Sequence, residues 1–329
     1  MLNRLIINNF KSIKKIEIDP SKINLFIGEP NTGKTNILES IGLLNSIQNG
    51  DIKKLIRCNN LMDLYNDFHI DIPIIIENNE FTYKLVYNKN KFNCNILIDK
   101  IRPQNLYEYD YYGNLEKAKM SVEIQKIHEI SSKYKFYNYV PLNKFENRSL
   151  DFLISPNGEN LSTIIIKNYE LREIIDNIFK KFNYKFVIEE PERDIKILKE
   201  DKNILILLPY TLFSDTLKRL VFYLTAIYSN KKAVICLNEP ESHAFPFYTK
   251  YLAEIIAENK NNNQFFITTH NLYFLRSIIE KGKKEDIRIY TTYLKNYETQ
   301  IKALSSDEIN AILNFDFDPF FNIDKYETE

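Results

Sequence analysis

An eight-residue stretch near the start of the chain combines two glycines, a lysine and a hydroxyl side chain: Gly28-Glu29-Pro30-Asn31-Thr32-Gly33-Lys34-Thr35. It matches the pattern G-x-x-x-x-G-K-[ST] of the Walker A phosphate loop. Residues 23–27 before it read as a short buried strand, and residues 36–44 after it carry apolar side chains at helical spacing. This order points backbone N–H groups and the positive end of a helix at phosphate, so the sequence predicts a phosphate-binding loop.

Each position of this loop has an expected role. Gly28 and Gly33 supply backbone freedom and let a ligand approach closely. Lys34 is expected to reach the β- and γ-phosphates, and the Thr35 hydroxyl is expected to hold Mg²⁺. A chance match in an ordinary turn is the alternative, because the pattern fixes only four positions. The predicted nucleotide-binding set is completed by Asn31, Thr32 and Asn36.

Polar side chains follow two apolar strands in the second half of the chain. Strand 233–237 ends in Asn238 and Glu239, and strand 265–269 ends in His270. Strands alternate with helices here, which predicts a parallel sheet, and the carboxyl ends of parallel strands share one edge. We therefore expect these side chains beside the phosphate loop. Taken singly, such a Glu is usually a solvated loop residue, and such a His is usually a surface or satisfied core residue.

Composition restricts the class of protein. The 329 residues suffice for one large or two modest domains, and 44 basic residues balance 44 acidic ones, so any nucleic-acid surface must be local. Cys58, Cys94 and Cys236 show no paired or metal-type spacing, which favours reduced thiols in a cytoplasmic protein. We expect no membrane association, because no apolar run is long enough to span a bilayer. Polar residues also interrupt the first residues too early for a signal peptide.

The predicted fold class is α/β, a P-loop NTPase with a parallel sheet core, an added antiparallel meander and an inserted α+β segment. Residues 1–140 are expected to form the N-terminal lobe, residues 141–200 the inserted lid segment, and residues 201–329 the C-terminal lobe with a short tail. Alternating stretches between residues 72 and 98, separated by Asn-rich turns, predict the meander. Residues 107–112 are expected to be loop.

Taken together, these motifs resemble the ABC-class ATPase heads of the SMC, RecF and OLD proteins, including their antiparallel meander. They resemble most closely the prokaryotic AAA-type ATPases without a nuclease domain. The resemblance covers most of residues 1–290. Beyond the phosphate loop, it rests on an opening strand turn, a recurrent turn, a shortened signature motif, a Walker B strand and a switch histidine, found at residues 9–13, 156–161, 214–219, 237–246 and 267–271.

The resemblance implies a cofactor, a metal and residue roles. ATP and Mg²⁺ would bind, with Lys34 on the phosphates and Glu239 as the general base that activates water. His270 would sense the γ-phosphate. Ser214, a good N-cap for the helix that follows it, would contact the γ-phosphate held by a second subunit, because this class sandwiches two ATPs between two head-to-tail heads. Lys11 would contact a phosphate from the first strand turn. An ATP-linked homodimer is therefore expected.

This chain departs from the family pattern at several positions. Asn238 stands where the Walker B strand normally carries an acid, so it can hold Mg²⁺ only through water and without charge. Loss of a charge-assisted hydrogen bond costs about 1.5–3 kcal/mol, or about one to two decades in rate, so we expect slow ATP hydrolysis. The signature motif lacks its usual glycines, which puts the contact of Ser214 in doubt. Gln104 and Gln125 are poorly situated for a Q-loop, and Asn138 is the remaining candidate.

Three functions stay open. The first is an ATPase whose dimerisation acts on DNA or a partner protein, as in repair or anti-phage defence. The second is a nucleotide-sensing module that regulates a partner effector with little or no hydrolysis. The third, a transporter subunit, is disfavoured by the insertion and the altered signature. The tail at 315–321 contains an Asp-x-Asp pair like that of OLD nucleases, but about 40 residues cannot hold a nuclease domain. We expect its aromatic residues to pack on the body and its acids to be solvated, with a docking segment as the alternative.

Overall fold

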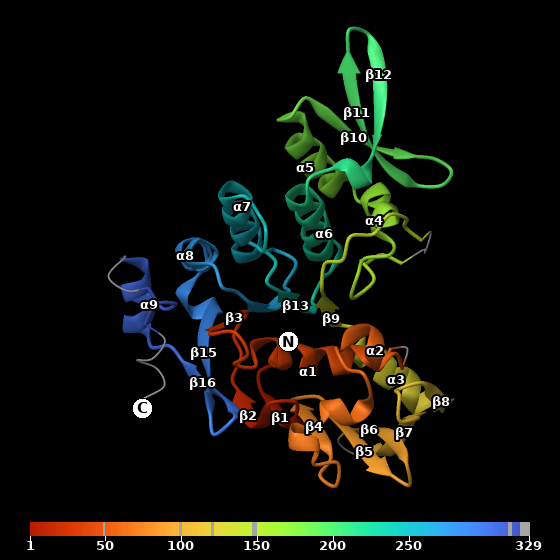
Figure 1. Ribbon diagram of the computed structural model, residues 1–329, viewed down its shortest axis with the longest axis vertical. Helices are drawn as coiled ribbons and strands as arrows, with labels where there is room; N and C mark the ends of the chain where they lie inside the picture. Colours follow the sequence, from red (N-terminus) through yellow and green to blue (C-terminus); the bar gives the residue numbers. More distant parts are fainter. Residues whose placement is uncertain (49, 99–100, 120–121, 147–149, 315–317, 323–329) are drawn as a thin grey trace.

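The computed structural model describes residues 1–48, 50–98, 101–119, 122–146, 150–314 and 318–322. The strands in these ranges form a six-stranded, a seven-stranded and a three-stranded sheet. Figure 1 shows the two larger sheets in the lower half of the view, and the smallest sheet projecting at the top.

The six-stranded sheet is the core that positions the predicted site. Its order is β16-β15-β3-β14-β13-β9, and the neighbours from β15 to β9 run parallel, as the continuous apolar runs in the sequence indicate. Alternate residues of these strands face two different hydrophobic clusters. The bounds are β3 Ile23–Gly28, β9 Tyr134–Tyr137, β13 Val234–Asn238, β14 Gln264–Thr268, β15 Ile287–Lys295 and β16 Glu298–Ala303.

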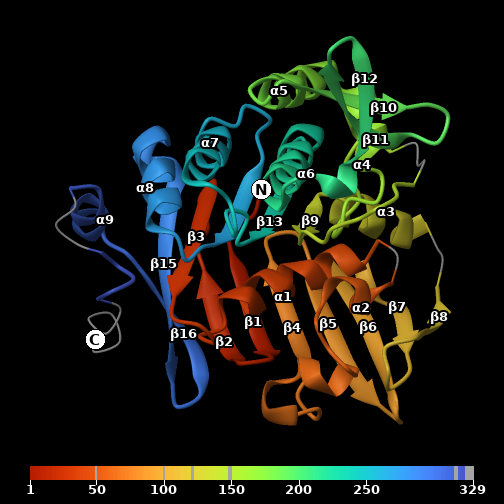
Figure 2. The same ribbon diagram turned by 45° about the horizontal axis from the view of Figure 1, so that its top comes forward.

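Helices cover both faces of this sheet. The helix that follows the phosphate loop, α1 (Lys34–Ser46), packs between the parallel sheet and the seven-stranded sheet, as Figure 2 shows. The opposite face is covered by helices from the second half of the chain: α6 Asp215–Ser229, α7 Pro246–Ala257 and α8 Leu272–Lys281. A last helix, α9 (Ser306–Leu313), begins with a capping box of Ser305 and Glu308 and packs against α8.

The seven-stranded sheet is antiparallel, with the order β2-β1-β4-β5-β6-β7-β8, and the predicted meander is its centre. Residues 107–112 were expected to be loop, and this is wrong in part: β7 continues to Tyr109, and Tyr107 and Tyr109 are buried against α1 and the meander. The bounds are β1 Leu5–Phe10, β2 Ile13–Ile18, β4 Ile74–Asn78, β5 Thr82–Asn88, β6 Lys91–Ile98, β7 Ile101–Tyr109 and β8 Leu115–Ala118. The helical segments near it are α2 Ile52–Leu55, η1 Leu61–Leu64, η2 Asn66–Phe68 and α3 Val122–Ser131.

The inserted segment leaves the parallel sheet after β9 and returns at α6. Its sheet, β10-β11-β12, is antiparallel, and its helix α5 packs on β10 through Phe179 and Phe186. This sheet extends beyond residue 200, where the sequence placed the end of the insertion, because β12 pairs along β11. The bounds are α4 Leu161–Lys167, α5 Tyr169–Lys180, β10 Tyr184–Glu189, β11 Asp194–Asp201, β12 Ile204–Pro209 and η3 Tyr210–Leu212; η4, Lys284–Asp286, lies outside the insertion.

In the part of the chain that the structure describes, no helix has the length and apolar character needed to cross a bilayer.

The aromatic residues of the tail pack only in part. Phe320 packs on the core, but Phe321 is 90% exposed, so the expected packing holds for only one of these two aromatic residues. Asp318 accepts a hydrogen bond from the Phe320 N–H, and Asp316 lies outside the described residues.

Candidate functional site

The loop between β3 and α1 has the backbone that only glycine allows at Gly33. This residue has a φ of 94°, and a Cβ built on it would lie 2.1 Å from Thr299 Oγ1. Gly28 is equally confined, since its Cβ would lie 2.3 Å from the Thr292 carbonyl oxygen. The loop therefore packs directly onto the β15–β16 hairpin, with no room for a side chain underneath.

Hydroxyl and amide groups form the floor of this loop. Thr32 Oγ1 lies 2.6 Å from Thr292 Oγ1, and Ser12 Oγ lies 2.6 Å from Thr299 Oγ1. Asn36 Nδ2 donates to Ser12 Oγ at 2.7 Å, so Thr32 and Asn36 support the loop from its inner side. The two hairpin threonines carry no signal in the sequence, because only the pairing of β15 with β3 brings them under the loop.

Lys34 begins α1 and is buried. Its ammonium donates to the carbonyl oxygens of Gly28 at 2.9 Å and Glu29 at 2.6 Å. Burial lowers the pKa of Lys34 to about 8, and the nearby carboxylates of Glu239 and Glu29 oppose this shift. Carbonyl oxygens are modest partners for a desolvated cation, so phosphate oxygens entering the loop would be stronger ones. The loop thus fits the polyphosphate that the sequence predicts for it.

Asn238, the last residue of β13, lies next to the start of α1. Its Oδ1 accepts hydrogen bonds from Thr35 Oγ1 at 3.3 Å and Thr268 Oγ1 at 2.9 Å. A hydroxyl beside an amide oxygen is an oxygen donor set that suits Mg²⁺, which keeps several waters and takes few protein ligands. Thr35 would be the direct ligand, and Asn238 would hold the metal through water.

Glu239 and His270 meet at the same edge of the sheet. His270 Nε2 lies 3.5 Å from Glu239 Oε1, and Ser242 Oγ donates to Glu239 Oε2 at 3.0 Å. Both side chains remain more than a third exposed, so solvent and substrate can reach them. Burial, together with the charge of Lys34, lowers the pKa of His270 and favours its neutral form. The three strands β3, β14 and β13 thus deliver a phosphate loop, a histidine and a carboxylate to one place.

Comparison with known proteins agrees with this geometry. A family model described as "AAA domain, putative AbiEii toxin, Type IV TA system" matches residues 23–276, most of the chain. The chain belongs to this family of AAA domains. The predicted recognition, an AAA-type ATPase domain resembling SMC and RecF heads, is confirmed.

Two curated proteins are similar to this AAA domain in sequence. A protein of Helicobacter pylori named "ATP/GTP phosphatase" is 20% identical over 360 residues, covering 94% of this chain and 93% of that protein. An uncharacterised protein of Methanocaldococcus jannaschii is 23% identical over 237 residues, covering 63% of this chain but only 28% of that protein. The likeness to the first spans nearly the whole of both chains.

Solved structures establish the fold. The crystal structure of an SmcHead bound to the C-winged helix domain of ScpA has a TM-score of 0.56 at 16% identity, covering 93% of this chain and 99% of that one. An Smc head with an extended coiled coil, bound to the C-terminal domain of ScpA derived from Pyrococcus furiosus, has a TM-score of 0.51 at 13% identity, covering 95% and 98%. The predicted P-loop fold with an ABC-type head is confirmed.

Two predicted residues of this AAA domain lie outside the cluster. Lys11 forms an ion pair with Glu39 at 2.5 Å and donates to the Arg57 carbonyl at 2.8 Å, so its ammonium already has partners within the protein, although Arg57 shares the same carboxylate at 2.8 Å. Ser214 is exposed, and its Oγ accepts from the Leu217 N–H at 3.4 Å as the N-cap of α6. Contact of either residue with a phosphate stays a prediction, and for Ser214 it requires a second subunit.

A cavity of about 350 Å³ adjoins the metal end of the site. Thr35, Asn238 and Asn138 line it, and Asn138 directly follows β9, the neighbour of β13 in the sheet. The position suits the Q-loop role suggested for Asn138. Gln125 is exposed on α3, and Gln104 belongs to β7 in the antiparallel sheet, so neither backbone lies at this strand edge.

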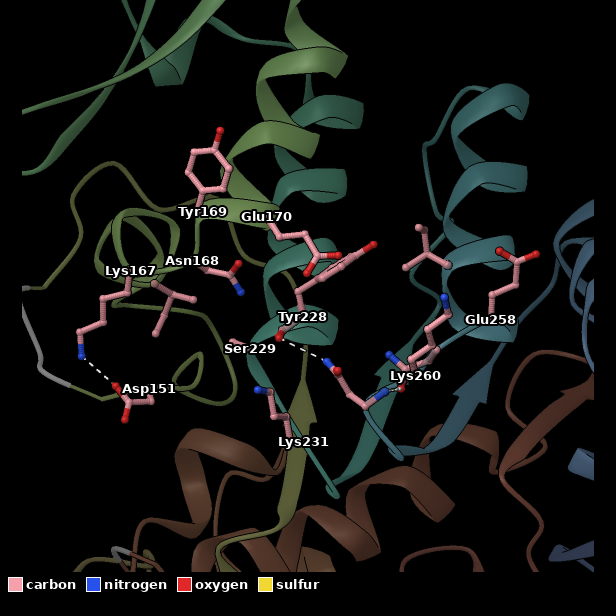
Figure 3. A pocket seen from close by; sticks show the side chains of 14 residues that line it. Asp151, Lys167, Asn168, Tyr169, Glu170, Tyr228, Ser229, Lys231, Glu258 and Lys260 are labelled. Carbon is pink, nitrogen blue, oxygen red and sulfur yellow. Dashed lines mark hydrogen bonds and ion pairs between the residues drawn. The ribbon is translucent and has the colours of Figure 1, made fainter.

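A larger cavity, of about 700 Å³, lies between the inserted segment and the ends of α6 and α7 (Figure 3). None of the predicted site residues lines it. Lysines and acids alternate around it, and Lys167 pairs with Asp151 at 2.9 Å. This mixture of charges selects no single class of ligand, so size alone does not make this cavity the functional site.

Proposed function

We propose that this protein is a Mg²⁺-dependent ATPase that binds ATP well and hydrolyses it slowly. One observation carries the proposal: the phosphate loop, Asn238, Glu239 and His270 converge at the carboxyl ends of three adjacent parallel strands. The name of the Helicobacter pylori relative, which covers nearly the same length, supports nucleoside triphosphate hydrolysis in particular. ATP is preferred over other triphosphates only through the resemblance to ATPase heads.

The side chains divide the work of hydrolysis. Lys34 and the loop N–H groups would hold the phosphates, and Glu239, held by Ser242, would orient the attacking water and accept its proton. His270, kept neutral by its surroundings, would donate a hydrogen bond toward the γ-phosphate. Bound Mg²⁺ would supply positive charge that offsets charge developing on the phosphates. Positioning and charge neutralisation suffice, because phosphoryl transfer needs no covalent intermediate on the protein.

Asn238 is the reason to propose slow turnover. Its amide oxygen brings no charge to the metal end of the site, and it is already shared by two threonine hydroxyls. A neutral acceptor stabilises a metal-bound water less than a carboxylate does. We expect the turnover number to lie below about 10 s⁻¹, a typical enzyme median.

We further propose that ATP binding drives a homodimer that acts on DNA or on a partner protein. Ser214 is exposed at the start of α6, where a second subunit could reach it, and Thr216 Oγ1 ties that start to the His243 carbonyl in the loop after Glu239. A movement of Ser214 on dimer formation would therefore be transmitted to the loop that follows Glu239. The description of the family, which names a putative toxin of a toxin–antitoxin system, supports a defence role over a repair role.

A nucleotide-sensing module for a partner effector is the second candidate. Asn238 favours it, because a site that binds ATP but hardly hydrolyses it holds its ATP-bound state for long periods. In this case the dimer, or the ATP-bound monomer, would itself be the signal. The cytoplasm is the proposed location for either function, since both need ATP.

Sedimentation of the wild type and Glu239→Gln, with and without Mg-ATP, tests this proposal. A dimer that forms only with ATP, and that persists in Glu239→Gln after the wild type has returned to monomer, supports a hydrolysing clamp. An ATP-bound protein that never changes mass contradicts the dimer and favours the sensing module. Absence of ATP binding overturns both candidates.

DNA as the target is tested on the trapped dimer. Binding of Glu239→Gln to duplex DNA, measured at increasing salt, should weaken linearly on a logarithmic scale if phosphate contacts contribute. If DNA binding is equal at all salt concentrations, or is absent at low salt, the result favours a protein partner as the target instead.

A further inference from the structure

A second carboxylate, Glu241, lies two residues after Glu239 and points into the protein. Its side chain is only 5% exposed. Its Oε1 accepts a hydrogen bond from Thr269 Oγ1 at 2.5 Å and a longer one from the His270 N–H at 3.4 Å. Its Oε2 has no hydrogen-bond partner among the described residues. A carboxyl group with one unsatisfied oxygen is costly to bury, so it invites a functional explanation.

The contacts of Glu241 fix the turn that carries the histidine. Thr269 Oγ1, which donates to Glu241, also accepts from the Asn271 N–H at 3.0 Å, and Asn271 caps α8 through the Phe274 N–H. Glu241 therefore contacts Thr269 and His270, the first two residues of the connection between β14 and α8. His270 lies in the middle of that connection, with its imidazole directed at Glu239.

A second link joins the same two turns on the catalytic side. The Glu239 N–H donates to the Thr268 carbonyl at 3.2 Å and to Thr268 Oγ1 at 3.1 Å. Glu239 itself has a φ of 44°, a left-handed backbone that a Glu rarely adopts unless its surroundings hold it there. The catalytic carboxylate and the histidine are thus set by contacts on both sides of the turn, and Glu241 provides the buried side.

We propose that Glu241 is a positioning residue for the ATPase reaction, whose Oε1 holds the Thr269–His270 turn so that the imidazole lies against Glu239. This rests on the proposed function. Glu241 does not touch the nucleotide site and acts through the backbone of His270. The Thr269–His270 turn needs an acceptor oxygen at the position of Glu241 Oε1, and it does not need a negative charge there.

Burial raises the pKa of Glu241 to about 7, with the carboxylate of Glu239 adding to the shift. The carboxyl is therefore readily protonated near neutral pH while its Oε1 continues to accept. Glutamine keeps that acceptor oxygen and places an amide where the unpartnered oxygen lies. Glu241→Gln is accordingly the conservative variant, and Glu241→Ala removes the acceptor.

Steady-state ATP hydrolysis of the full chain tests the proposal. We expect Glu241→Ala to lower kcat about tenfold with an almost unchanged KM for Mg-ATP, because the phosphate loop is untouched. Glu241→Gln should keep kcat within about threefold of wild type. Thr269→Val should imitate Glu241→Ala, and the double variant should be no worse than either, since both remove the same hydrogen bond. Glu258→Ala, which removes an exposed carboxylate at the end of α7, is the matched control.

A spectroscopic readout separates this proposal from the proposed function. The chain contains four histidines, so His270→Gln identifies the imidazole signal of His270 by its loss. In Glu241→Ala the chemical shift of that signal should change, whereas in Glu241→Gln it should stay as in the wild type. This outcome supports the positioning role even if the protein hydrolyses no ATP.

Other results would overturn the proposal. If Glu241→Ala folds, as judged by its thermal transition, and keeps both the His270 signal and kcat, Glu241 does not position the turn. If Glu241→Gln is as impaired as Glu241→Ala, charge rather than the acceptor oxygen is required. If KM rises while kcat holds, Glu241 supports nucleotide binding instead.

Discussion

The phosphate loop and the edge strand β9 of the parallel sheet each bury a lysine, in opposite surroundings. Lys34, at the phosphate loop, is 5% exposed and donates to the carbonyls of Gly28 and Glu29. Lys135, in β9, is 4% exposed, and its ammonium lies 3.5 Å from the centroid of the Phe152 ring. Its backbone pairs with β13, but among the described residues its ammonium has no hydrogen bond or ion pair. The two side chains are equally buried, but a ligand could replace the carbonyl partners of Lys34, whereas the partner of Lys135 is a half-buried aromatic ring of the protein itself.

This difference separates a lysine that can bind a ligand from a lysine whose burial only lowers the stability of the fold. Burial lowers the pKa of Lys34 to about 8 and that of Lys135 to about 7, so the charged form is disfavoured in both places. Lys34 lies at a loop that a phosphate can enter, and nearby carboxylates already favour its charge. Lys135 has an aromatic face, which offsets only part of the cost of its charge, and it lines none of the larger cavities described above. A buried lysine therefore indicates a site only where a ligand can replace its partners.

Replacing each lysine by methionine should give the largest contrast. We expect Lys34→Met to weaken Mg-ATP binding about 1,000-fold, or about 4 kcal/mol, because two charge-assisted contacts with phosphate are lost. Titration calorimetry with Mg-ATP and phosphate release would measure this effect. Lys135→Met is the matched control and should bind ATP like the wild type. Equal losses in the two variants would mean that the phosphate loop is not the ATP site.

The same Lys135→Met variant should change stability with pH. The lysine has a folded pKa of about 7 and an ordinary value of 10.5, so between these values the unfolded chain holds a proton that the folded chain has lost. Wild-type stability therefore rises as pH increases from 7 to 10.5, and the cost of Lys135 is full at pH 7 and below. Methionine removes this cost, so the variant should gain about 3 kcal/mol more at pH 7 than at pH 10. Urea unfolding at the two pH values measures this gain in the free energy of unfolding. An equal gain at both pH values would contradict the lowered pKa of Lys135 in the folded protein.

The site around Lys34 could be predicted from the sequence, but the burial of Lys135 could not. Lys34, Thr35, Glu239 and His270 were found because each follows a strand in a local motif, and parallel strands bring their carboxyl ends together. The burial of Lys135 was not predicted, because a lysine between two aromatic residues of an edge strand gives no sign of its depth.

Register explains the other omissions. Thr292 and Thr299 lie more than 250 residues from the loop they support, and only the pairing of β15 with β3 brings them there. Lys11 shows the reverse case: its motif is visible in the sequence, but its ammonium pairs with Glu39, one turn after Thr35 on α1, a carboxylate that Arg57 shares. Local patterns thus predict which strand ends meet, while the partners of each side chain depend on contacts distant in sequence.

Gly33→Ala tests whether the backbone around Lys34 must be held as it is. The new Cβ would meet Thr299 Oγ1, and alanine does not favour a φ of 94°. We expect a loss of about 2 kcal/mol in stability and at least a tenfold loss in ATP affinity. Gly42→Ala is the matched control: Gly42 lies within α1 without a positive φ, and alanine favours a helix by about 1 kcal/mol. Its new Cβ would lie 3.0 Å from Ile56 Cδ1, the end of a flexible side chain, so only a small shift of that side chain is needed. Chemical denaturation and ATP titration measure both variants, and a tolerated Gly33→Ala would mean that the loop has another available conformation.

Asn238→Asp should have the smallest effect, and it changes the electrostatics of Lys34 without touching its contacts. A carboxylate at the end of β13 would restore a charged partner beside Thr35 and would raise the pKa of Lys34. We expect kcat to rise about tenfold, which corresponds to about 1.4 kcal/mol in the transition state, and less Mg²⁺ to be needed for half-maximal rate. Asn157→Asp places the same charge on the wall of the same cavity, at a residue without a proposed role in the site, and measures what general negative potential does. A similar increase in both variants would attribute the effect to the field around Lys34, whereas an increase confined to Asn238→Asp would attribute the slow rate to this one amide at the metal position.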